Sequence, residues 1–410
     1  MKTKIFNGTL LTPHRAIGNG AIIIQDGKIL DVCQSNPDTS DTVDIDAGGN
    51  YISPGFIDLH VHGGGGHDFM DGSVQAFLQI AETHARYGTT AMVPTTLTSE
   101  KEDLLRTLDL YEQANQENNK GAQFLGMHLE GPYFAQSQRG AQDPRYIRNP
   151  DAEEYEEILN YSSSIVRWSA APELPGSIEF GQRLMQKGIL PAAAHTDAIY
   201  EEVLEAFENG YTLATHLYSA MSGVTRKNAF RYAGMIESAL LLDMDVEIIA
   251  DGVHLPAPLL KLVYKIKGPD KIALITDAMR AAAMPAGDSI LGPLSNGLKV
   301  IVEDGVAKLP DRSSFAGSVA TADRLVRTMI NLADIPLLQA VKMMTLTPAR
   351  IMKSDHTKGL LVKGKDADIV LFDEDIQIQK TFVNGRLVFD KVNHEGSRKE
   401  IQAKTAGNVY

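Results

Sequence analysis

The sequence predicts an α/β protein, namely a (β/α)8 TIM barrel with a small β-sandwich built from both chain ends. Two observations predict the barrel. Short apolar runs typical of buried strands alternate with helical stretches over the middle of the chain. Polar residues follow the carboxyl ends of these runs, which is where barrel enzymes carry their active sites. A doubly wound sheet would show the same alternation, but the position of the polar residues favours the barrel.

The two chain ends predict the sandwich. Strand-like runs surround two dipeptides that favour tight two-residue hairpin turns, Asp26-Gly27 and Asn384-Gly385. The runs near these turns are residues 21–25, 28–32, 368–372 and 379–383. Neither end has enough strands to bury a face by itself. We therefore expect residues 1–53 and 358–410 to form one sandwich domain.

Residues 54–357 are expected to form the barrel. The strand-like runs in this stretch are residues 91–94, 123–127, 190–194, 247–250 and 273–275. Helical stretches lie between them, for example residues 74–87, 199–209 and 258–267. Residues 287–311 contain two strand-like runs around Asp304-Gly305, which predicts a hairpin inserted late in the barrel.

Composition narrows the class of protein. The 410 residues carry a net charge of -13, which argues against a broad nucleic-acid-binding face but still permits a local site for an anionic small molecule. Cys33 is the sole cysteine, so an internal disulfide and a cysteine-based structural zinc site are excluded. Neither a secretory signal nor a long apolar run is visible. We therefore expect a cytoplasmic protein with neither a membrane span nor a nucleic-acid partner.

Histidine placement points to a metal site. His60 and His62 are two residues apart at the end of an apolar run, and residues two apart on a strand point to the same face. Two converging imidazoles suit a transition-metal ion. A single His-x-His motif is weak evidence for a metal site, because two ordinary histidines can also stand at the entry to a loop.

Further polar residues end later strand-like runs in the same way. They are Glu130, His195, His216 and Asp277, with His254 close behind another run. Asp277 follows a buried apolar strand, where a carboxylate is costly unless it is paired or binds a ligand. A structural salt bridge is the alternative for Asp277. His128 shares a strand face with Glu130, and we expect it to support the site rather than to bind the metal.

In this order, these residues resemble the amidohydrolase superfamily, and four stretches are similar to the N-acetylglucosamine-6-phosphate deacetylases. The stretches are Pro54-Gly55-Phe56-Ile57-Asp58-Leu59-His60-Val61-His62-Gly63, His128-Leu129-Glu130-Gly131-Pro132, Thr215-His216-Leu217-Tyr218-Ser219-Ala220-Met221 and Thr276-Asp277-Ala278-Met279. The likeness covers nearly the whole chain. It implies a metal-dependent hydrolase that acts on an amino sugar phosphate, usually as a homodimer.

The resemblance also implies roles for individual residues. Glu130, His195 and His216 would hold the principal divalent ion, with zinc expected first and iron or manganese as alternatives. His60 and His62 could hold a second ion. Asp277 would also be a metal ligand and would act as general base and acid, and His254 would polarise the acetyl carbonyl. The implied substrate-binding residues are Ala141, Gln142, Ser219, Ala220, Arg226, His254, Phe315, Ala316 and Gly317.

The sequence departs from the family pattern where the sugar and phosphate would lie. Gln142 stands where the family often has histidine, and Ser219 replaces an asparagine. The family's phosphate-binding arginine segment is replaced by residues 225–231, in which Arg226 is the first candidate, with Lys227 and Arg231 behind it. A solvated charged loop is the alternative reading of this segment.

Three further readings of the function stay open or are disfavoured. A deacetylase of another N-acetyl amino sugar, such as N-acetylgalactosamine 6-phosphate, is the main alternative. An inactive assembly subunit is a second alternative, which the intact ligand set and Asp277 disfavour. Dihydroorotase-like enzymes commonly carry a bridging modified lysine, and Glu130 fills that place here.

Overall fold

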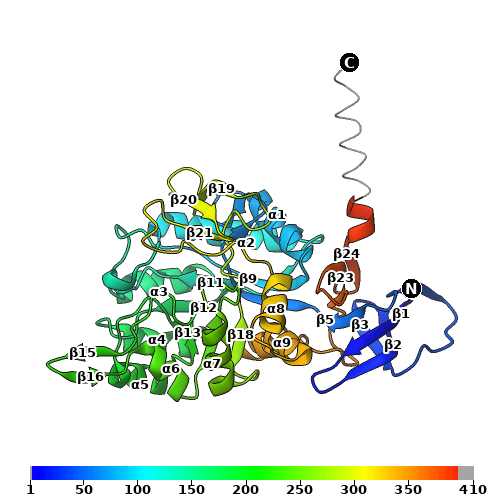
Figure 1. Cartoon of the computed structure of the whole chain (residues 1–410). Helices are drawn as coiled ribbons and strands as arrows, with labels where there is room; N and C mark the ends of the chain where they lie inside the picture. The colour runs from blue at the N-terminus through cyan, green and yellow to red at the C-terminus, as the bar shows by residue number, and fades with distance from the viewer. Residues whose placement is uncertain (1, 396–410) are drawn as a thin grey trace.

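A computed structural model describes residues 2–395 and consists of a barrel with a separate sheet at its side (Figure 1). Residues 396–410, which the sequence assigns to the terminal domain, lie outside the described residues. No helix within residues 2–395 is both long enough and apolar enough to cross a membrane. The boundaries predicted for the two domains stay a prediction.

Strands from both ends of the chain share one eight-stranded sheet. Its order is β24-β23-β22-β5-β1-β2-β3, and β4 pairs with β1. The strands are β1 (Lys2–Leu11), β2 (Ala16–Gln25), β3 (Lys28–Cys33), β4 (Thr42–Asp46), β5 (Tyr51–Pro54), β22 (Ile369–Phe372), β23 (Ile378–Val383) and β24 (Arg386–Asp390). Antiparallel pairing of β22 with β5 joins the two ends. Whether this sheet folds into two facing layers, as the predicted sandwich requires, stays a prediction.

Three tight turns have the conformation that their dipeptides predict. Asp26-Gly27, Asp304-Gly305 and Asn384-Gly385 all have positive φ at both residues, between 49° and 75°. In the first, Gln25 pairs with Lys28, which leaves a two-residue loop. Positive φ at both positions defines the type I′ turn, whose twist matches that of the flanking strands. The chain direction therefore reverses at the predicted points.

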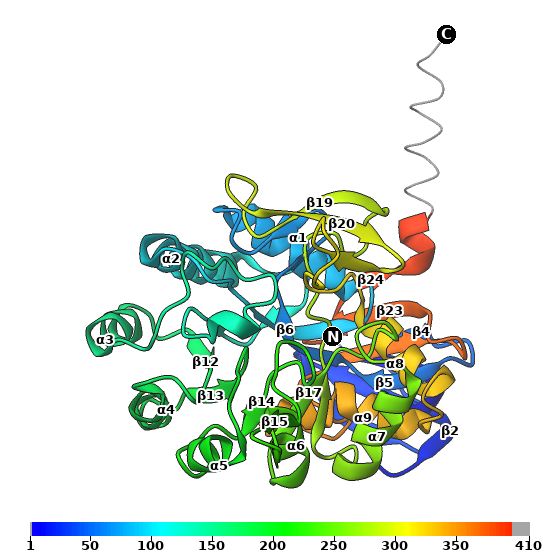
Figure 2. The ribbon, with the colours of Figure 1, turned by 60° about the vertical axis from the view of Figure 1, so that its left-hand side comes forward.

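The barrel consists of parallel strands in two hydrogen-bonded sheets, of order β10-β9-β6 and β11-β12-β13-β14-β17-β18. Its strands are β6 (Phe56–Val61), β9 (Thr89–Pro94), β10 (Gln123–Phe124), β11 (Met127–Glu130), β12 (Ile165–Ala170), β13 (Leu190–Ala193), β14 (Leu213–Ala214), β17 (Asp245–Ile248) and β18 (Ile272–Leu274). Parallel bridges link Val61 to Ala278 and Thr95 to His128, so the two sheets meet along both edges. The strands curl around a common axis (Figure 2).

Helices cover the outside of the strands (Figure 2). They are α1 (Val74–Ala85), α2 (Lys101–Glu117), α3 (Ala152–Tyr161), α4 (Ser177–Gln186), α5 (Tyr200–Glu208), α6 (Met235–Leu241), α7 (Ala257–Lys267), α8 (Ala322–Asn331), α9 (Leu337–Met344) and α10 (Leu346–Ile351), with a short 3-10 helix at Gln136–Gln138. In α1, Ser73 caps the first turn, and Phe77, Ile80 and Ala81 are buried at helical spacing. That face packs in the main core between helices and strands.

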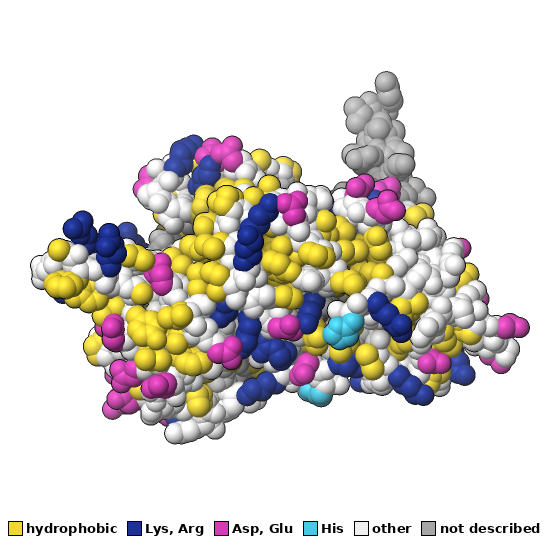
Figure 3. Space-filling model, turned by 60° about the horizontal axis from the view of Figure 1, so that its bottom comes forward, with side chains coloured by type: hydrophobic (Ala, Val, Ile, Leu, Met, Phe, Trp, Pro, Cys, Tyr) yellow, Lys and Arg dark blue, Asp and Glu magenta, His cyan; other side chains and the backbone are white. Residues whose placement is uncertain are grey.

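Smaller antiparallel elements lie in the loops. They are β7 (Gly63–Gly64) with β8 (His67–Asp68), β15 (Thr225–Lys227) with β16 (Phe230–Tyr232), and β19 (Gly287–Leu291) with β20 (Leu298–Glu303) and β21 (Val306–Lys308). The last group occupies the place of the predicted inserted hairpin and has one strand more. The β15–β16 hairpin projects at the left end of Figure 1, and Lys and Arg side chains gather at that end in Figure 3.

Two barrel features differ from the sequence prediction. The single strand expected over residues 123–127 is divided into β10 and β11, because Gly126 adopts a φ of 119° that interrupts regular pairing. Strand β12 was absent from the predicted runs, since Arg167 and Ser169 interrupt its apolar pattern. Both residues are fully buried, so β12 is a central strand despite its polar side chains.

Candidate metal and active site

The predicted ligands come from different strands and meet at one end of the barrel. His60 is the penultimate residue of β6 and Glu130 is the last residue of β11. His195, His216 and Asp277 follow β13, β14 and β18 within three residues of each strand end. The carboxyl ends of parallel barrel strands lie at the same rim, which is why residues far apart in the chain converge.

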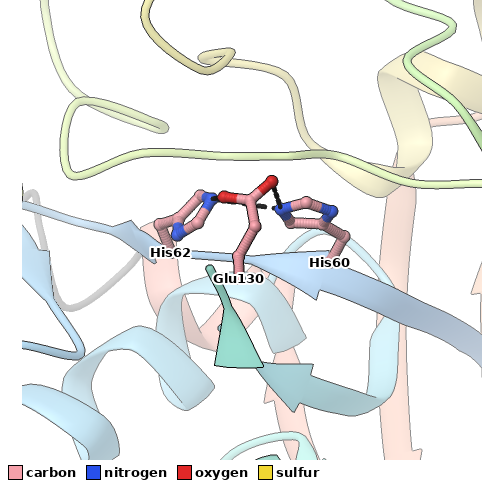
Figure 4. Close-up of side chains that lie close together, drawn as sticks. All are labelled: His60, His62 and Glu130. Atoms are coloured by element: carbon pink, nitrogen blue, oxygen red, sulfur yellow. Dashed lines mark hydrogen bonds and ion pairs between the residues drawn. The ribbon is translucent and has the colours of Figure 1, made fainter. Parts of the chain in front are cut away.

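The first group of donors consists of His60, His62 and Glu130 (Figure 4). The two Nε2 atoms lie 3.1 Å apart. Each lies 3.4 Å from an oxygen of Glu130, His60 from Oε1 and His62 from Oε2. Asp277 Oδ1 lies 3.5 Å from His60 Nε2 and 3.2 Å from His62 Nε2. The imidazoles therefore converge on two carboxylates, as their strand positions predict.

A second group contains Glu130 again, with His195 and His216. His195 Nε2 lies 3.4 Å and His216 Nε2 lies 3.0 Å from Glu130 Oε1. Within each group, one donor atom from each residue lies within 4.8 Å of the others. The two groups share Glu130, so this carboxylate stands between two potential ion positions.

Backbone geometry at the rim is unusual for these residue types. His195, His216 and Asp277 have φ values of 47°, 35° and 46°, in the left-handed region that disfavours side chains with a Cβ. Such conformations persist only where the surrounding structure fixes them, and they gather at functional sites. In each case the chain turns sharply after a strand and carries the side chain toward the common centre.

The electrostatics of the site favour a cation. Burial lowers the pKa of His60 and His62, but the carboxylates of Glu130 and Asp277 outweigh burial and raise these pKa values to about 9 and about 10. Burial raises the pKa of both carboxyl groups, and the histidines outweigh it, so each carboxyl pKa lies below its ordinary value. Buried charges of this kind require a partner, and a divalent ion bound by imidazole and carboxylate is a suitable one.

The histidine rings are held by partners on their other side. His62 Nδ1 lies 3.3 Å from the carbonyl oxygen of Thr95, and His195 Nδ1 lies 2.8 Å from that of Gln138. Each carbonyl can accept only an N–H, so Nδ1 carries a proton, and Nε2 is the nitrogen that can bind an ion in the neutral ring. His128 makes no contact with the donors through its nitrogens, which face Thr95 and Ser169 instead. The supporting position predicted for His128 agrees with these contacts.

Gln142, expected to contact the substrate, also makes a contact with Glu130 that the sequence did not indicate. Its side-chain oxygen accepts hydrogen bonds from the backbone N–H and the hydroxyl of Thr98, at 2.9 and 3.0 Å. Because that oxygen faces a donor, the amide nitrogen must face Glu130, and it donates to Oε2 at 2.7 Å. Gln142 thus lines the cavity and also holds the carboxylate shared by both donor groups.

A cavity of about 490 Å³ opens above the donors. Its walls include seven of the residues that resemblance assigned to the substrate, namely Ala141, Gln142, Ser219, Ala220, His254, Phe315 and Gly317. Ala316 is fully buried behind this wall and does not line the cavity. Arg226 does not line it either, because it lies exposed on the β15–β16 hairpin.

Two cationic side chains that were not among the predicted site residues line the cavity. Lys308 ends β21, and Arg312 lies in the loop that follows. Lys308 Nζ lies 2.6 Å from Asp304 Oδ2, and Arg312 Nε lies 3.0 Å from Glu303 Oε1. Their position depends on how the inserted sheet folds over the barrel, which no local pattern indicates.

His254 reaches the same cavity from the loop after β17. Its Nδ1 lies 2.8 Å from Asp251 Oδ2, and its ring lies 4.5 Å from the ring of Phe315 between centroids. Asp251 Oδ1 also accepts hydrogen bonds from the backbone N–H groups of Val253 and His254. The buried carboxylate therefore fixes the His254 ring and directs Nε2 away from itself, toward the cavity wall that Phe315 shares.

Comparison with known proteins places this geometry in a family. Residues 51–388 match the model of the Amidohydrolase family. The chain is 33% identical over 373 residues to an N-acetylglucosamine-6-phosphate deacetylase of Lysinibacillus sphaericus, covering 89% of this chain and 92% of that one. It is 32% identical to an N-acetylgalactosamine-6-phosphate deacetylase of Escherichia coli O157:H7, covering 92% and 97%.

A solved structure extends the match to three dimensions. It is a mutant N-acetyl-D-glucosamine-6-phosphate deacetylase of Mycobacterium smegmatis in complex with N-acetyl-D-glucosamine-6-phosphate. It superposes with a TM-score of 0.86 at 28% identity and covers 94% of this chain and 99% of that one. The chain therefore belongs to the amidohydrolase family, in the group that contains the N-acetylglucosamine-6-phosphate deacetylases.

Proposed function

We propose that this protein is a metal-dependent hydrolase that converts N-acetylglucosamine 6-phosphate to glucosamine 6-phosphate and acetate. The observation that carries the proposal is that one cavity is lined by residues of both donor groups and also by Asp277 and His254. The relatives that match over most of the chain are named as deacetylases of amino sugar phosphates.

The donor set fits a divalent ion. We propose that Glu130, His195 and His216 hold the principal ion, and that His60 and His62 with Glu130 hold a second. Asp277 Oδ1 lies within 3.5 Å of the Nε2 atoms of both His60 and His62 and can also contribute an oxygen to that second ion. When bound, a divalent ion polarises a carbonyl group and lowers the pKa of a coordinated water. Zinc suits imidazole and carboxylate donors, and iron and manganese bind the same groups.

Asp277 is suited to move the proton during hydrolysis. Its lowered pKa keeps the carboxylate ionised at neutral pH, so it can accept a proton from the attacking water. The water oxygen bonds to the acetamide carbonyl carbon as that proton leaves. Asp277 then returns the proton to the sugar nitrogen while the C–N bond breaks, which releases acetate and the free amine. His254 would donate a hydrogen bond to the developing oxyanion, and Asp251 fixes its ring for this purpose.

We propose that the phosphate of the substrate is recognised by cations at the cavity mouth. Lys308 and Arg312 line the cavity within the same chain. Arg226 lies on an exposed hairpin and could complete a phosphate site only at the cavity of another subunit, which is the arrangement that the family resemblance implies for a homodimer.

Matched arginine variants separate these two sources of phosphate recognition. Arg312→Met should raise KM for the phosphorylated substrate at least tenfold and leave KM for the unphosphorylated sugar within about twofold. Arg226→Met should raise KM for the phosphorylated substrate only if Arg226 of a second subunit reaches the cavity. In that case, diluting the wild-type protein below the dimer dissociation constant should raise the same KM. Arg183→Met, on the outer helix α4, serves as the control. If a variant changed KM equally for both substrates, the substituted arginine would not be the residue that binds the phosphate.

The sugar epimer is the main alternative, because one relative is named as an N-acetylgalactosamine-6-phosphate deacetylase. Ser219 and Gln142 line the cavity, and both depart from the family pattern. The deciding experiment measures acetate release by the zinc-loaded protein from both epimers, each with and without phosphate. A higher kcat/KM for the glucosamine form supports the proposal, and a higher value for the galactosamine form favours the alternative. Release from neither would refute deacetylation of these sugars.

A further inference from the structure

A buried polar layer lies beneath the candidate metal site. It contains Arg167 and Ser169 from β12, Glu247 from β17, Thr215 beyond β14, and His128 from β11. All five side chains are fully buried. Barrel interiors are normally filled by branched apolar side chains, and burying charged groups is costly. A layer of this composition therefore requires an explanation beyond packing.

The centre of the layer is an ion pair with two parallel contacts. Both guanidinium Nη atoms of Arg167 contact the carboxylate of Glu247, and Nη2 lies 2.7 Å from Oε2. Arg167 Nη2 also donates to the hydroxyl of Thr215 at 2.8 Å, and Nη1 donates to the carbonyl of Leu59 at 3.2 Å. These contacts fix the plane of the Glu247 carboxylate.

His60 lies between this ion pair and the donors above it. Its Nε2 faces Glu130 and Asp277, whereas Nδ1 lies 3.8 Å from Glu247 Oε2. Nδ1 has no hydrogen-bond partner among the described residues, and the Glu247 carboxylate, at 3.8 Å, is the charged group within ion-pair distance of it. The other histidine of this group differs, because His62 Nδ1 faces a neutral backbone carbonyl.

We propose that Glu247 is a positioning residue that holds the Nδ1–H of His60 and thereby presents the Nε2 lone pair to the ion at His60 and His62. A carboxylate behind a metal-binding histidine fixes the tautomer and makes the ring a stronger donor. Arg167 keeps Glu247 ionised and aligned inside the barrel. The inference rests on the metal-dependent function proposed above, and it assigns Glu247 to one ion position rather than to both.

The test is metal content rather than turnover. Purified protein would be dialysed against buffered zinc over a range of free concentrations, and bound zinc would be measured by mass spectrometry. Wild-type protein should bind two ions. Glu247→Gln should weaken the second ion about 10- to 100-fold and leave the first within threefold. His62→Asn, which removes a donor from the same position, should weaken the same ion and leave the other in place.

A second variant and a control distinguish a specific effect on metal binding from a general loss of fold stability. Glu247→Gln leaves Arg167 without its counter-charge and can destabilise the fold. The double variant Arg167→Leu/Glu247→Leu removes both charges together, and it should show the same selective loss of one ion. Ser169→Ala disturbs the same polar layer through His128 and Thr215 but does not contact His60, so it should keep both ions.

The outcomes separate this inference from the proposed function. The inference would be overturned if both Glu247 variants bound two ions with wild-type affinity, or if they weakened both ions equally. It would also be overturned if Ser169→Ala showed the same selective loss of one ion. Wild-type protein that takes up one ion at every zinc concentration would also overturn it. Wild-type protein that binds no ion would instead refute the metal-dependent function itself.

Discussion

Loading the site with metal should release protons, and the number follows from the histidine pKa values. His60 and His62 have pKa values of about 9 and about 10, so both are protonated at pH 7 without a bound ion. An imidazole that binds metal through Nε2 must lose that proton. At about 1.4 kcal/mol for each pH unit, deprotonation at pH 7 costs about 3 kcal/mol for His60 and about 4 kcal/mol for His62. An ion bound by both histidines displaces two protons, so its apparent affinity should rise about 100-fold for each pH unit between 7 and 9.

Titration calorimetry in buffers of different ionisation enthalpy measures this release directly. Loading wild-type protein at pH 7 should release at least two protons for each chain. His62→Asn should release about one proton fewer, and His356→Asn, which changes an exposed histidine outside both donor groups, should match wild type. A release that is the same in wild type and His62→Asn would refute the assignment of raised pKa values to this histidine pair.

The same pKa values give opposite pH trends to the stability of the metal-free and loaded protein. A histidine pKa raised from about 6.5 to about 9 stabilises the fold by about 3 kcal/mol below pH 6.5, and this contribution is lost as pH rises through 9. The metal-free protein should therefore melt at lower temperature as pH rises from 6.5 to 9. The loaded protein should not follow this trend, because deprotonation strengthens metal binding over the same interval. If the melting temperature changed with pH in the same way with and without a chelator, the argument would be contradicted.

Three further variants test the remaining assignments. Asp277→Asn should keep its zinc but lower kcat by about 10²- to 10⁴-fold, and a wild-type rate would remove Asp277 from proton transfer. Gln142→Leu should lower the free energy of unfolding by about 1–3 kcal/mol, because Thr98 and Glu130 both lose a buried hydrogen bond; an unchanged denaturation midpoint would contradict the contacts described. His195→Ala should weaken the principal ion but leave the His60 and His62 position able to bind zinc, and unchanged metal content would refute its role as a ligand.

The convergence of the candidate ligands could be predicted because it depends on simple geometry. Residues that end consecutive parallel strands must lie at one rim, so His60, Glu130, His195 and Asp277 could be grouped from their places in the chain. Turn positions could be predicted for a similar reason, since Asp-Gly and Asn-Gly favour the positive φ that a two-residue loop requires. Both predictions use the backbone alone and need no knowledge of which elements pack together.

The cavity walls could not be predicted in this way. Lys308 and Arg312 reach the site because an inserted sheet folds over the barrel mouth, and its direction depends on contacts distant in the sequence. One such contact is the pairing of Arg280 with Asp71, which lies beside the loop that follows β19. The role of Gln142 was hidden for a related reason, because its hydrogen bonds join Thr98 to Glu130 across two strands of the barrel.

Arg167 and Glu247 show where a sequence signal exists and still falls short. Each carries a charge within a predominantly buried strand, and such a charge is costly unless it has a partner of opposite sign. That reasoning predicts that each has a buried partner. It cannot identify the pair, because β12 and β17 are separated by two strands in the sheet and meet only across the barrel interior. Curvature of the sheet thus decides which charges pair, and in this protein it places that pair directly beneath His60.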